Sequence, residues 1–98
     1  MSRIVVLGGG ESGIGAAVLA KVKGHDTFLS DNSTIAEKGK ETLAKYGIPY
    51  EEGGHTMSRI LDADEVVKSP GIPDTIPVIQ SILNAGIPVI SEIEFGGR

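Results

Sequence analysis

The sequence predicts an α/β protein built on a Rossmann-like, doubly wound sheet of about five parallel strands in the order 3-2-1-4-5, with helices on both faces. Three observations support this fold class. Short β-branched runs alternate with segments of helical hydrophobic spacing along the 98 residues, a pattern typical of parallel strands joined by right-handed crossovers. The first apolar run leads directly into a glycine-rich loop and a helix. The length suits one domain with one modest core.

The first strand, the first helix and the second strand have the clearest signals. The run RIVVL at residues 3–7 is short, β-branched and closed by glycines, as expected of a buried strand. Residues 12–23 have helical spacing and precede Gly24, a residue type that often follows a helix C-terminus. Residues 26–30 form the second strand, which places Asp31 at its end. The first helix is expected to face the core with Ile14, Ala17, Val18 and Val22.

The second helix is predicted to begin just after residues 33–34 and to end at Gly47. Ser33 or Thr34 is the expected N-cap, and Glu37 stands three residues after Thr34, in the capping-box position. The expected inner face of this helix consists of Ile35, Gly39, Leu43 and Tyr46.

The second half of the chain continues the alternation. Residues 48–52 are a weak third strand, residues 56–61 a short helix, and residues 65–69 a fourth strand. A helix starting near Pro77 and a fifth strand at residues 87–91 complete the pattern. The inward positions expected in the two helices are Met57, Ile60, Leu61, Val78, Ile79, Ile82 and Leu83. In this arrangement the loops at 8–13, 31–34 and 69–73 leave the carboxyl edge of the sheet, where open α/β sheets bind ligands.

Composition excludes several classes of function. The net charge is −4 and the nine Lys and Arg residues are scattered, which argues against a nucleic-acid partner. The chain has no cysteine, so disulfides and thiolate metal sites are excluded, and its two histidines show no metal-ligand spacing. No apolar run approaches the roughly 20 residues of a membrane span, and no signal-peptide layout is present, so we expect a cytoplasmic protein.

The glycine loop carries the strongest functional signal. Gly8, Gly10 and Gly13 spell G-x-G-x-x-G directly after the first strand, and Asp31 follows Gly13 by 18 residues. In this fingerprint the helix N-terminus directs free N–H groups and its positive dipole end at a diphosphate. An acidic residue at the position of Asp31 meets a ribose hydroxyl or a base edge. Pattern alone therefore predicts binding of a nucleotide and favours NAD.

Other acidic residues and a histidine are assigned structural roles at this stage. His55 is expected to be a solvated loop or helix-cap histidine, because no partner with motif spacing accompanies it. Glu51 and Glu52 are interpreted as a solvated strand end. Glu92 and Glu94 are interpreted as first-turn residues that favour a helix dipole, and no catalytic residue is assigned.

Two further stretches change the preferred nucleotide. VVKSPGIP at residues 66–73 and NAGIPVISEIEF at 84–95, together with LGGGESGIG at 7–15, resemble the N-terminal domain of the Mur ligases, and most closely the members that add D-glutamate. The resemblance covers essentially the whole chain. The pairing of SPGIP with SEIEF about twenty residues later is fairly specific, whereas the glycine loop alone is not.

The resemblance implies a domain that binds the uridine diphosphate part of UDP-N-acetylmuramoyl-L-alanine. Backbone N–H groups at the start of the first helix would hold the diphosphate, the residues after the second strand would contact uracil, and the loop after the fourth strand would form a wall of the uridine pocket. Carried over to this sequence, these residues are Gly10, Glu11, Ser12 and Gly13, then Asp31 and Asn32, then Ser69, Pro70 and Gly71.

The resemblance also implies a reaction, ATP-dependent amide formation between the substrate carboxylate and D-glutamate in peptidoglycan precursor synthesis. ATP and Mg²⁺ would serve the parent enzyme, and this chain would bind no cofactor itself. No Walker-A pattern occurs in the sequence. Residues 1–98 are therefore expected to be a single N-terminal substrate-binding domain without the central ATP-binding and C-terminal domains of the family, and to be inactive alone. The central domain would be its partner.

Two alternatives remain open at this stage. A regulatory NAD(H)-binding module would use the same glycine loop, with Asp31 on the adenine ribose, but would have no reason for SPGIP followed by SEIEF. A pure interaction domain would leave three glycine- or proline-shaped loops converging without a ligand.

Overall fold

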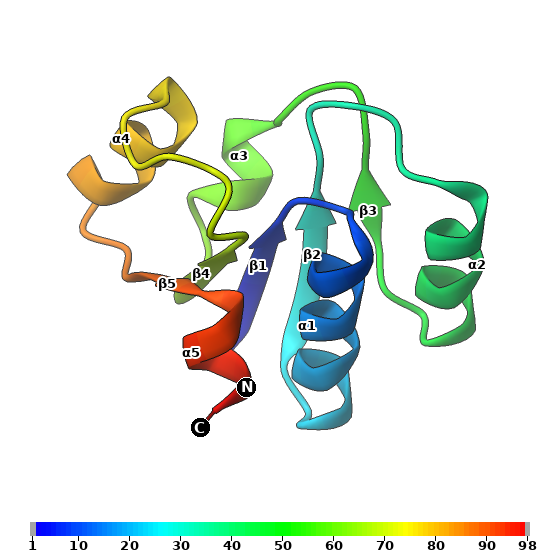
Figure 1. Ribbon diagram of the computed structural model, residues 1–98. Coiled ribbons are helices and arrows are strands. Elements are labelled where there is room, and N and C mark those ends of the chain that lie inside the picture. Colours follow the sequence, from blue (N-terminus) through cyan, green and yellow to red (C-terminus); the bar gives the residue numbers. More distant parts are fainter. Residues whose placement is uncertain (1, 98) are drawn as a thin grey trace.

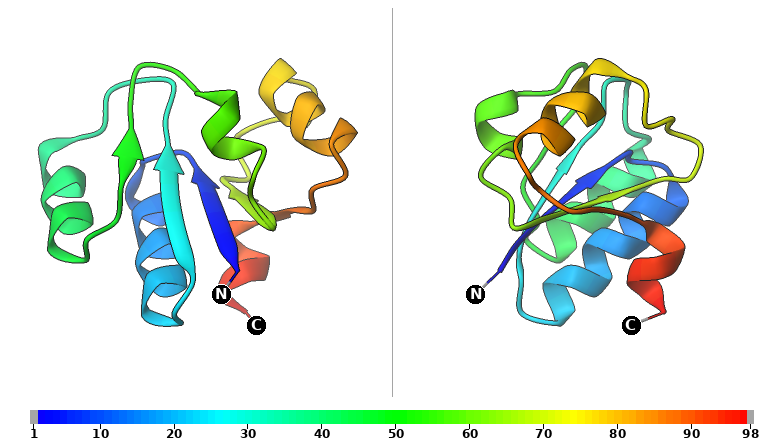
Figure 2. Two further views of the ribbon diagram at one scale, coloured as in Figure 1. Left: turned by 180° about the vertical axis from the view of Figure 1, so that it is seen from behind. Right: turned by 90° about the vertical axis from the view of Figure 1, so that its left-hand side faces the viewer.

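The computed structural model describes residues 2–97 and contains a five-stranded parallel sheet in the order β3-β2-β1-β4-β5, which confirms the predicted fold class and strand order (Figure 1). Helices cover both faces of the sheet. Helix α1 lies in front of the strands in Figure 1 and behind them in the left-hand view of Figure 2, which is seen from the opposite side. In chain order the elements are β1 (Arg3–Leu7), α1 (Glu11–Val22), β2 (Asp26–Ser30), α2 (Glu37–Lys45), β3 (Tyr50–Glu51), α3 (Met57–Ile60), β4 (Glu65–Lys68), α4 (Pro77–Asn84), β5 (Val89–Ser91) and α5 (Glu92–Gly96).

The strand register aligns the ends of the three central strands. Leu7, the last residue of β1, pairs with Ser30 of β2 on one side and with Lys68 of β4 on the other. The three connections that follow these strands therefore start at the same edge of the sheet. This alignment positions the candidate site.

The two faces of the sheet form separate apolar cores, because successive strand side chains point to opposite faces. In β1, Ile4 and Val6 pack toward α1, α2 and α5, and Val5 and Leu7 pack toward α3 and α4. The β1 side chains from Ile4 to Leu7 are at most 2% exposed. A strand buried on both faces explains why RIVVL is a continuous apolar run without polar alternation. None of the helices within residues 2–97 combines the length and the apolar character that crossing a bilayer requires.

The predicted capping box of the second helix is wrong. Helix α2 begins at Glu37, with Ala36 as an N-cap that offers no side-chain hydrogen bond. The Ser33 hydroxyl instead donates to Asp31 Oδ1 at 2.9 Å, and the Ile35 N–H donates to Glu52 Oε1 at 2.8 Å. A local bond to Asp31 and a tertiary bond to Glu52 thus replace the predicted cap.

Four side chains predicted to face the core are exposed. They lie at the end of a helix or just past it, where the chain turns toward the next strand and the apolar period no longer follows the sheet surface. These residues are Val22 (68% exposed), Tyr46 (37%), Leu61 (40%) and Leu83 (44%).

Candidate functional site

The loop between β1 and α1 is built by close backbone packing. Gly8 has φ +105°, a conformation that L side chains rarely adopt, and its N–H donates to the Ser30 carbonyl at 2.9 Å. A Cβ at Gly13 would overlap the Gly8 carbonyl oxygen. Two of the three fingerprint glycines are therefore required by the turn and by the approach of the first turn of α1 to the loop.

The N-terminus of α1 is open to a ligand. Gly10 is the N-cap, and a Cβ there would meet no atom within 4 Å. The Ile14 N–H donates to the Gly10 carbonyl at 2.9 Å, so the N–H groups of residues 11–13 precede this helical hydrogen bond. Glu11 and Ser12 are exposed. The geometry leaves the positive end of the α1 dipole facing solvent beside the glycine loop.

The Asp31 carboxylate ties the glycine loop to the end of β2. Its Oδ2 accepts a hydrogen bond from the Gly9 N–H at 2.7 Å, and its Oδ1 accepts from both the N–H and the hydroxyl of Ser33, each at 2.9 Å. Burial opposes ionisation of Asp31, but the hydrogen bonds from the Ser33 and Gly9 N–H groups outweigh it and lower its pKa. Asn32, the neighbouring candidate, is exposed.

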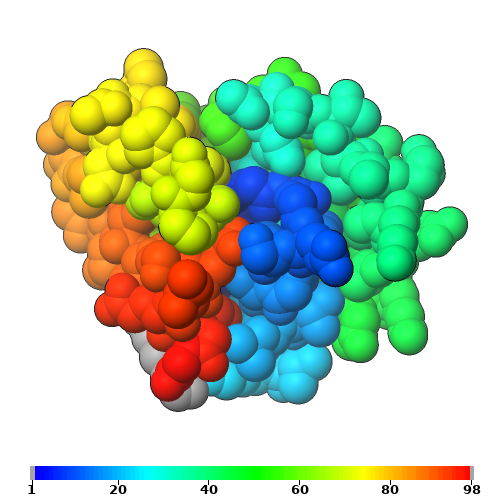
Figure 3. Space-filling model, in the orientation of Figure 1, coloured from blue at the N-terminus to red at the C-terminus, as the bar shows by residue number. Residues whose placement is uncertain are grey.

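The loop after β4 lies on the other side of the glycine loop. A Cβ at Gly8 would lie 3.6 Å from Ile72 Cδ1 and 3.9 Å from Ser69 Cβ. Ser69 Oγ accepts a hydrogen bond from the Gly71 N–H at 3.3 Å, and Pro70 and Gly71 are exposed. The structure thus brings the three predicted loop segments together. Figure 3 shows them on one face, with the segment after β1 between those after β2 and β4.

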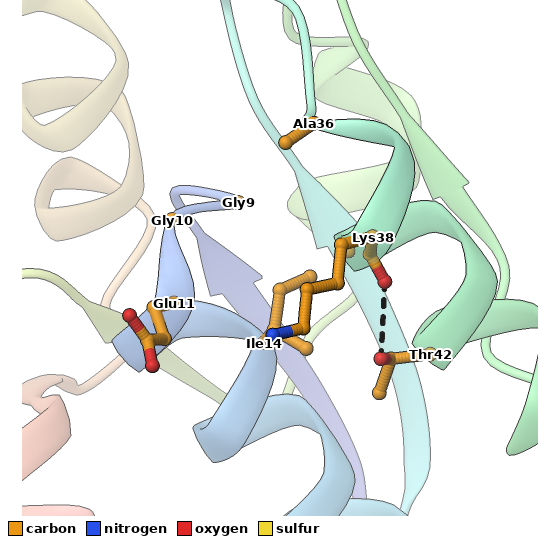
Figure 4. A pocket seen from close by; sticks show the side chains of 8 residues that line it. Gly9, Gly10, Glu11, Ile14, Ala36, Lys38 and Thr42 are labelled. Atoms are coloured by element: carbon orange, nitrogen blue, oxygen red, sulfur yellow. Dashed lines mark hydrogen bonds between the residues drawn. The ribbon is translucent and has the colours of Figure 1, made fainter.

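A cavity of about 290 Å³ adjoins this edge but has a different lining from the predicted crevice. It lies between the glycine loop and α2, and it includes Gly10 and Glu11 but neither the residues after β2 nor those after β4 that the sequence indicated. Figure 4 shows the Lys38 side chain extending across it toward Ile14. Its complete lining is Gly9, Gly10, Glu11, Ile14, Ala36, Lys38, Gly39 and Thr42. Sequence reasoning missed Lys38 and Thr42, whose spacing of four residues on α2 was the available signal.

His55 and Glu51 are partly buried rather than solvated as expected, whereas Glu52 is exposed, as expected. His55 Nδ1 lies 2.6 Å from the hydroxyl oxygen of Ser30, which is fully buried and also donates to Glu51 Oε2 at 2.8 Å. Glu52 pairs with Lys40 at 2.8 Å besides accepting from the Ile35 N–H. The hydrogen bond from Lys40 and that from Ile35 outweigh partial desolvation and lower the pKa of Glu52. Glu51 thus holds the connection after β3 against the end of β2, and Glu52 holds it against the start of α2.

The acidic residues near the C-terminus lie in the first turn of α5, as predicted. Ser91 caps this helix by accepting a hydrogen bond from the Glu94 N–H at 3.1 Å. Glu92 is 9% exposed, and its Oε1 has no hydrogen-bond partner among residues 2–97. It borders a second cavity of about 320 Å³ between α1 and α5. Within the same described range, no group of three or more His, Asp or Glu side chains is arranged to hold a metal ion.

Comparisons with known proteins agree with the fold. The chain is 64% identical over its full length to UDP-N-acetylmuramoylalanine–D-glutamate ligase of Bacteroides fragilis, and it spans 22% of that protein. The fold matches a murein peptide ligase from Psychrobacter arcticus with a TM-score of 0.85 and 27% identity, over 97% of this chain and 20% of that one. It also matches UDP-N-acetylmuramate–alanine ligase from Thermotoga maritima with a TM-score of 0.81 and 25% identity, over 98% and 22% of the two chains.

The chain thus spans about a fifth of the length of the relatives it matches. The family model of the MurD N-terminal domain matches residues 3–76, which is well over half of the chain and includes the glycine loop, the end of β2 and the loop after β4. The chain belongs to the MurD N-terminal domain family.

Proposed function

We propose that this chain docks the UDP part of UDP-N-acetylmuramoyl-L-alanine for a longer ligase that adds D-glutamate. The observation that supports this proposal is the meeting of three strand-end loops around the open N-terminus of α1, in a chain of this family. Parallel α/β sheets bind ligands at this edge. The similarity to D-glutamate ligases favours a uridine diphosphate over NAD as the nucleotide.

Each segment has a distinct role in this proposal. The N–H groups of Glu11, Ser12 and Gly13, with Gly10 giving unobstructed access, hold the diphosphate at the positive end of α1. The exposed amide of Asn32 contacts the uracil.

Asp31 and the loop after β4 complete the proposed site. The Asp31 carboxylate keeps acceptor capacity beyond the bonds that fix the loop, and it contributes at the base or the ribose. The wall of the proposed uridine pocket after β4 consists of Ser69, Pro70 and Gly71.

The reaction itself is assigned to the longer protein. Residues 1–98 act as one substrate-docking domain, and ATP and Mg²⁺ serve the central domain, because no Walker-A pattern occurs in this sequence. The parent ligase, working in the cytoplasm, would join D-glutamate to the substrate carboxylate. The 98-residue chain alone would release no ADP from ATP in the presence of the substrate and D-glutamate.

An NMR titration of the labelled chain tests the docking role. UDP-N-acetylmuramoyl-L-alanine, UDP and NAD are added in parallel. We expect saturable amide shifts from the two uridine ligands at the three loops, and none from NAD. Shifts with NAD alone would contradict the proposal and support a dinucleotide module. The diagnostic amides are those of Ser12, Gly13, Asp31, Asn32 and Gly71.

A pair of variants makes the titration specific. Asn32→Ala removes an exposed amide at the proposed base contact and should weaken UDP binding about fivefold, the effect of one hydrogen bond of about 1 kcal/mol. Asn84→Ala, at the last residue of α4, is the matched control and should leave the dissociation constant unchanged. Equal affinities in both variants would reject the Asn32 contact.

A further inference from the structure

A chain of hydrogen bonds at the end of β2 joins residues that the docking role does not use. Ser30 Oγ lies 2.8 Å from Glu51 Oε2 and 2.6 Å from His55 Nδ1. Glu51 also accepts hydrogen bonds from the Thr56 N–H at 2.8 Å and from the Thr56 hydroxyl at 2.6 Å. Because the Ser30 side chain is fully buried, these contacts take the place of solvent.

The number of hydrogens determines the direction of these bonds. A serine hydroxyl has one hydrogen to donate. Burial opposes ionisation of Glu51, but the two bonds from Thr56 and the one from Ser30 outweigh it and lower its pKa, so this carboxylate only accepts. The Ser30 hydrogen is therefore directed at Glu51 rather than at the Gly54 carbonyl, whose oxygen lies farther from Oγ, at 3.5 Å. Ser30 Oγ must then accept from His55, and Nδ1 must be the protonated ring nitrogen.

Backbone hydrogen bonds connect residues 51–56 to the edge of the sheet where the nucleotide is proposed to bind. This edge consists of the loops at 8–13, 31–34 and 69–73 and is called the nucleotide edge below. The Asp31 N–H donates to the Glu51 carbonyl at 3.0 Å, and the Gly54 N–H donates to the Asp31 carbonyl at 3.3 Å. The Gly53 N–H donates to the Ser33 carbonyl at 3.1 Å. Residues 51–56 thus contact residues 30–33 through both backbone and side-chain hydrogen bonds. Asp31 in turn holds the glycine loop through Gly9.

We propose that His55 is a positioning residue for the nucleotide edge: as the Nδ1–H tautomer it donates to Ser30 and, through Ser30 and Glu51, fixes the backbone that presents Asp31 and Asn32. The effect on a uridine ligand rests on the proposed docking function. The tautomer and the loop geometry do not, so they can be tested without a ligand.

The first experiment is nitrogen-15 NMR of the imidazole rings in the ligand-free 98-residue chain at about pH 8, where an ordinary histidine is neutral. We expect Nδ1 of His55 to give a protonated-type resonance and Nε2 an unprotonated one. His25, at the turn before β2, supplies the comparison within the same sample. A His55 ring protonated on Nε2 alone would overturn the proposal.

The second experiment uses substitutions at His55 that separate its two nitrogens. His55→Asn keeps a donor near the position of Nδ1, His55→Gln places its amide nearer Nε2, and His55→Leu removes both. We expect His55→Asn to bind UDP within about twofold of the unmodified chain, and the other two to bind about fivefold more weakly. The Gln and Leu variants should also shift the amides of Gly9, Asp31 and Ser33. His25→Leu should do neither.

Two results of this series would overturn the positioning role. Unchanged affinity and unchanged loop amides in His55→Leu would mean that the contact with Ser30 has no consequence. Affinity retained by the Gln variant and lost by the Asn variant would mean that Nε2 contacts the ligand directly. If the unmodified chain fails to bind UDP, the docking function fails, and the tautomer and the loop amides still decide whether His55 positions the edge.

Ser30→Ala is a second variant in case His55→Leu fails to fold. It removes the hydroxyl that joins His55 to Glu51 with little change in side-chain volume. We expect the loop amides to shift as in His55→Leu and UDP affinity to fall about fivefold. The double variant Ser30→Ala/His55→Leu should be no weaker than either single variant, because both break one chain of bonds. Fully additive losses would contradict a shared route through Ser30.

Discussion

The two sides of the nucleotide edge are held in different ways. On the β2 side, carboxylates and a serine connect three separate segments through charge-assisted hydrogen bonds, as when Asp31 holds Gly9 and Glu51 holds Ser30 and Thr56. On the β4 side, the loop is held by Lys68 and by neutral hydrogen bonds, from the Gly71 N–H to Ser69 Oγ and from Gln80 Nε2 to the Asp74 carbonyl. Lys68 Nζ donates to the Ile72 carbonyl at 2.8 Å and lies 3.3 Å from Asp74.

This difference indicates which side already has its binding geometry in the ligand-free protein. Hydrogen bonds to charged groups are worth about 1.5–3 kcal/mol each, and a network of them holds one geometry. We therefore expect the β2 side, which carries the proposed base contacts, to be preorganised. The β4 side, with exposed Pro70 and Gly71, has fewer such restraints and is expected to adjust around the uridine.

The largest expected effect comes from Gly13→Ala, which would disrupt the packing of α1 against the glycine loop that lies between the two sides. The new methyl, attached directly to the backbone of α1, would overlap the backbone carbonyl of Gly8, so neither atom can shift without moving α1 or the end of β1. We expect a loss of about 3 kcal/mol or more in the free energy of unfolding, measured by urea denaturation.

Gly15→Ala is the matched control for that substitution. It lies in the same helix, and its Cβ would enter open space. Because alanine has the higher helix propensity, we expect this variant to be about 0.5–1 kcal/mol more stable than the unmodified chain. Equal stabilities for the two variants would mean that the contact between the loop and the helix is not a constraint.

The sequence predicted the fold and the meeting of the loops because both follow from local patterns. The β-branched run of β1, the glycines after it and the repeated alternation with helices determine the strand order through general topological rules. The bonding within the β2 side could not be predicted in this way. Ser30, Glu51 and His55 meet only because the short strand β3 pairs with β2, and no local period signals that contact.

The same limit explains the missed start of α2. A capping box is a local signal, whereas the observed partner of the Ile35 N–H is Glu52, 17 residues away. For Asp31 the sequence predicted the position at the end of β2. It did not predict that both carboxylate oxygens accept hydrogen bonds within the protein.

Acidification provides the second test and should affect the β2 side first. The folded-state pKa values of Asp31 and Glu51 are lowered from ordinary values of 3.8 and 4.5. Their contribution to stability is therefore present above those ordinary values and is lost as the pH falls through the lowered ones. Given the hydrogen bonds involved, we expect a loss of about 2 kcal/mol.

Amide hydrogen exchange at stepwise lower pH would locate this loss. The amides of Gly9, Ser33 and Thr56, which donate to the two carboxylates, should lose protection before the amide of Ile72, which donates to the Ser69 carbonyl. A variant carrying Asp31→Asn and Glu51→Gln should show a smaller pH dependence. Loss of protection at Ile72 first would reverse the assignment of the better-held side.

The smallest expected effect tests the β4 side through Lys68→Met, which keeps most of the apolar stem and removes the ammonium group. Its side chain is 14% exposed and Asp74 is 69% exposed, so the bond to the Ile72 carbonyl outweighs the ion pair. We expect a loss of about 1 kcal/mol in the free energy of unfolding and faster exchange at Ile72. Asp74→Asn, which removes only the ion pair, should cost less than about 0.5 kcal/mol.

The position of the amide shifts in Lys68→Met matters more than the size of the stability loss. If the two sides are held independently, the shifts stay within the loop after β4 and leave Asp31 and Gly9 unchanged. Ser69 and Ile72 nevertheless lie against Gly8, which offers a route by which a change on the β4 side can reach the β2 side. Shifts at Asp31 as large as those at Ile72 would show that the glycine loop transmits the change, and the edge would then respond to a ligand as one unit.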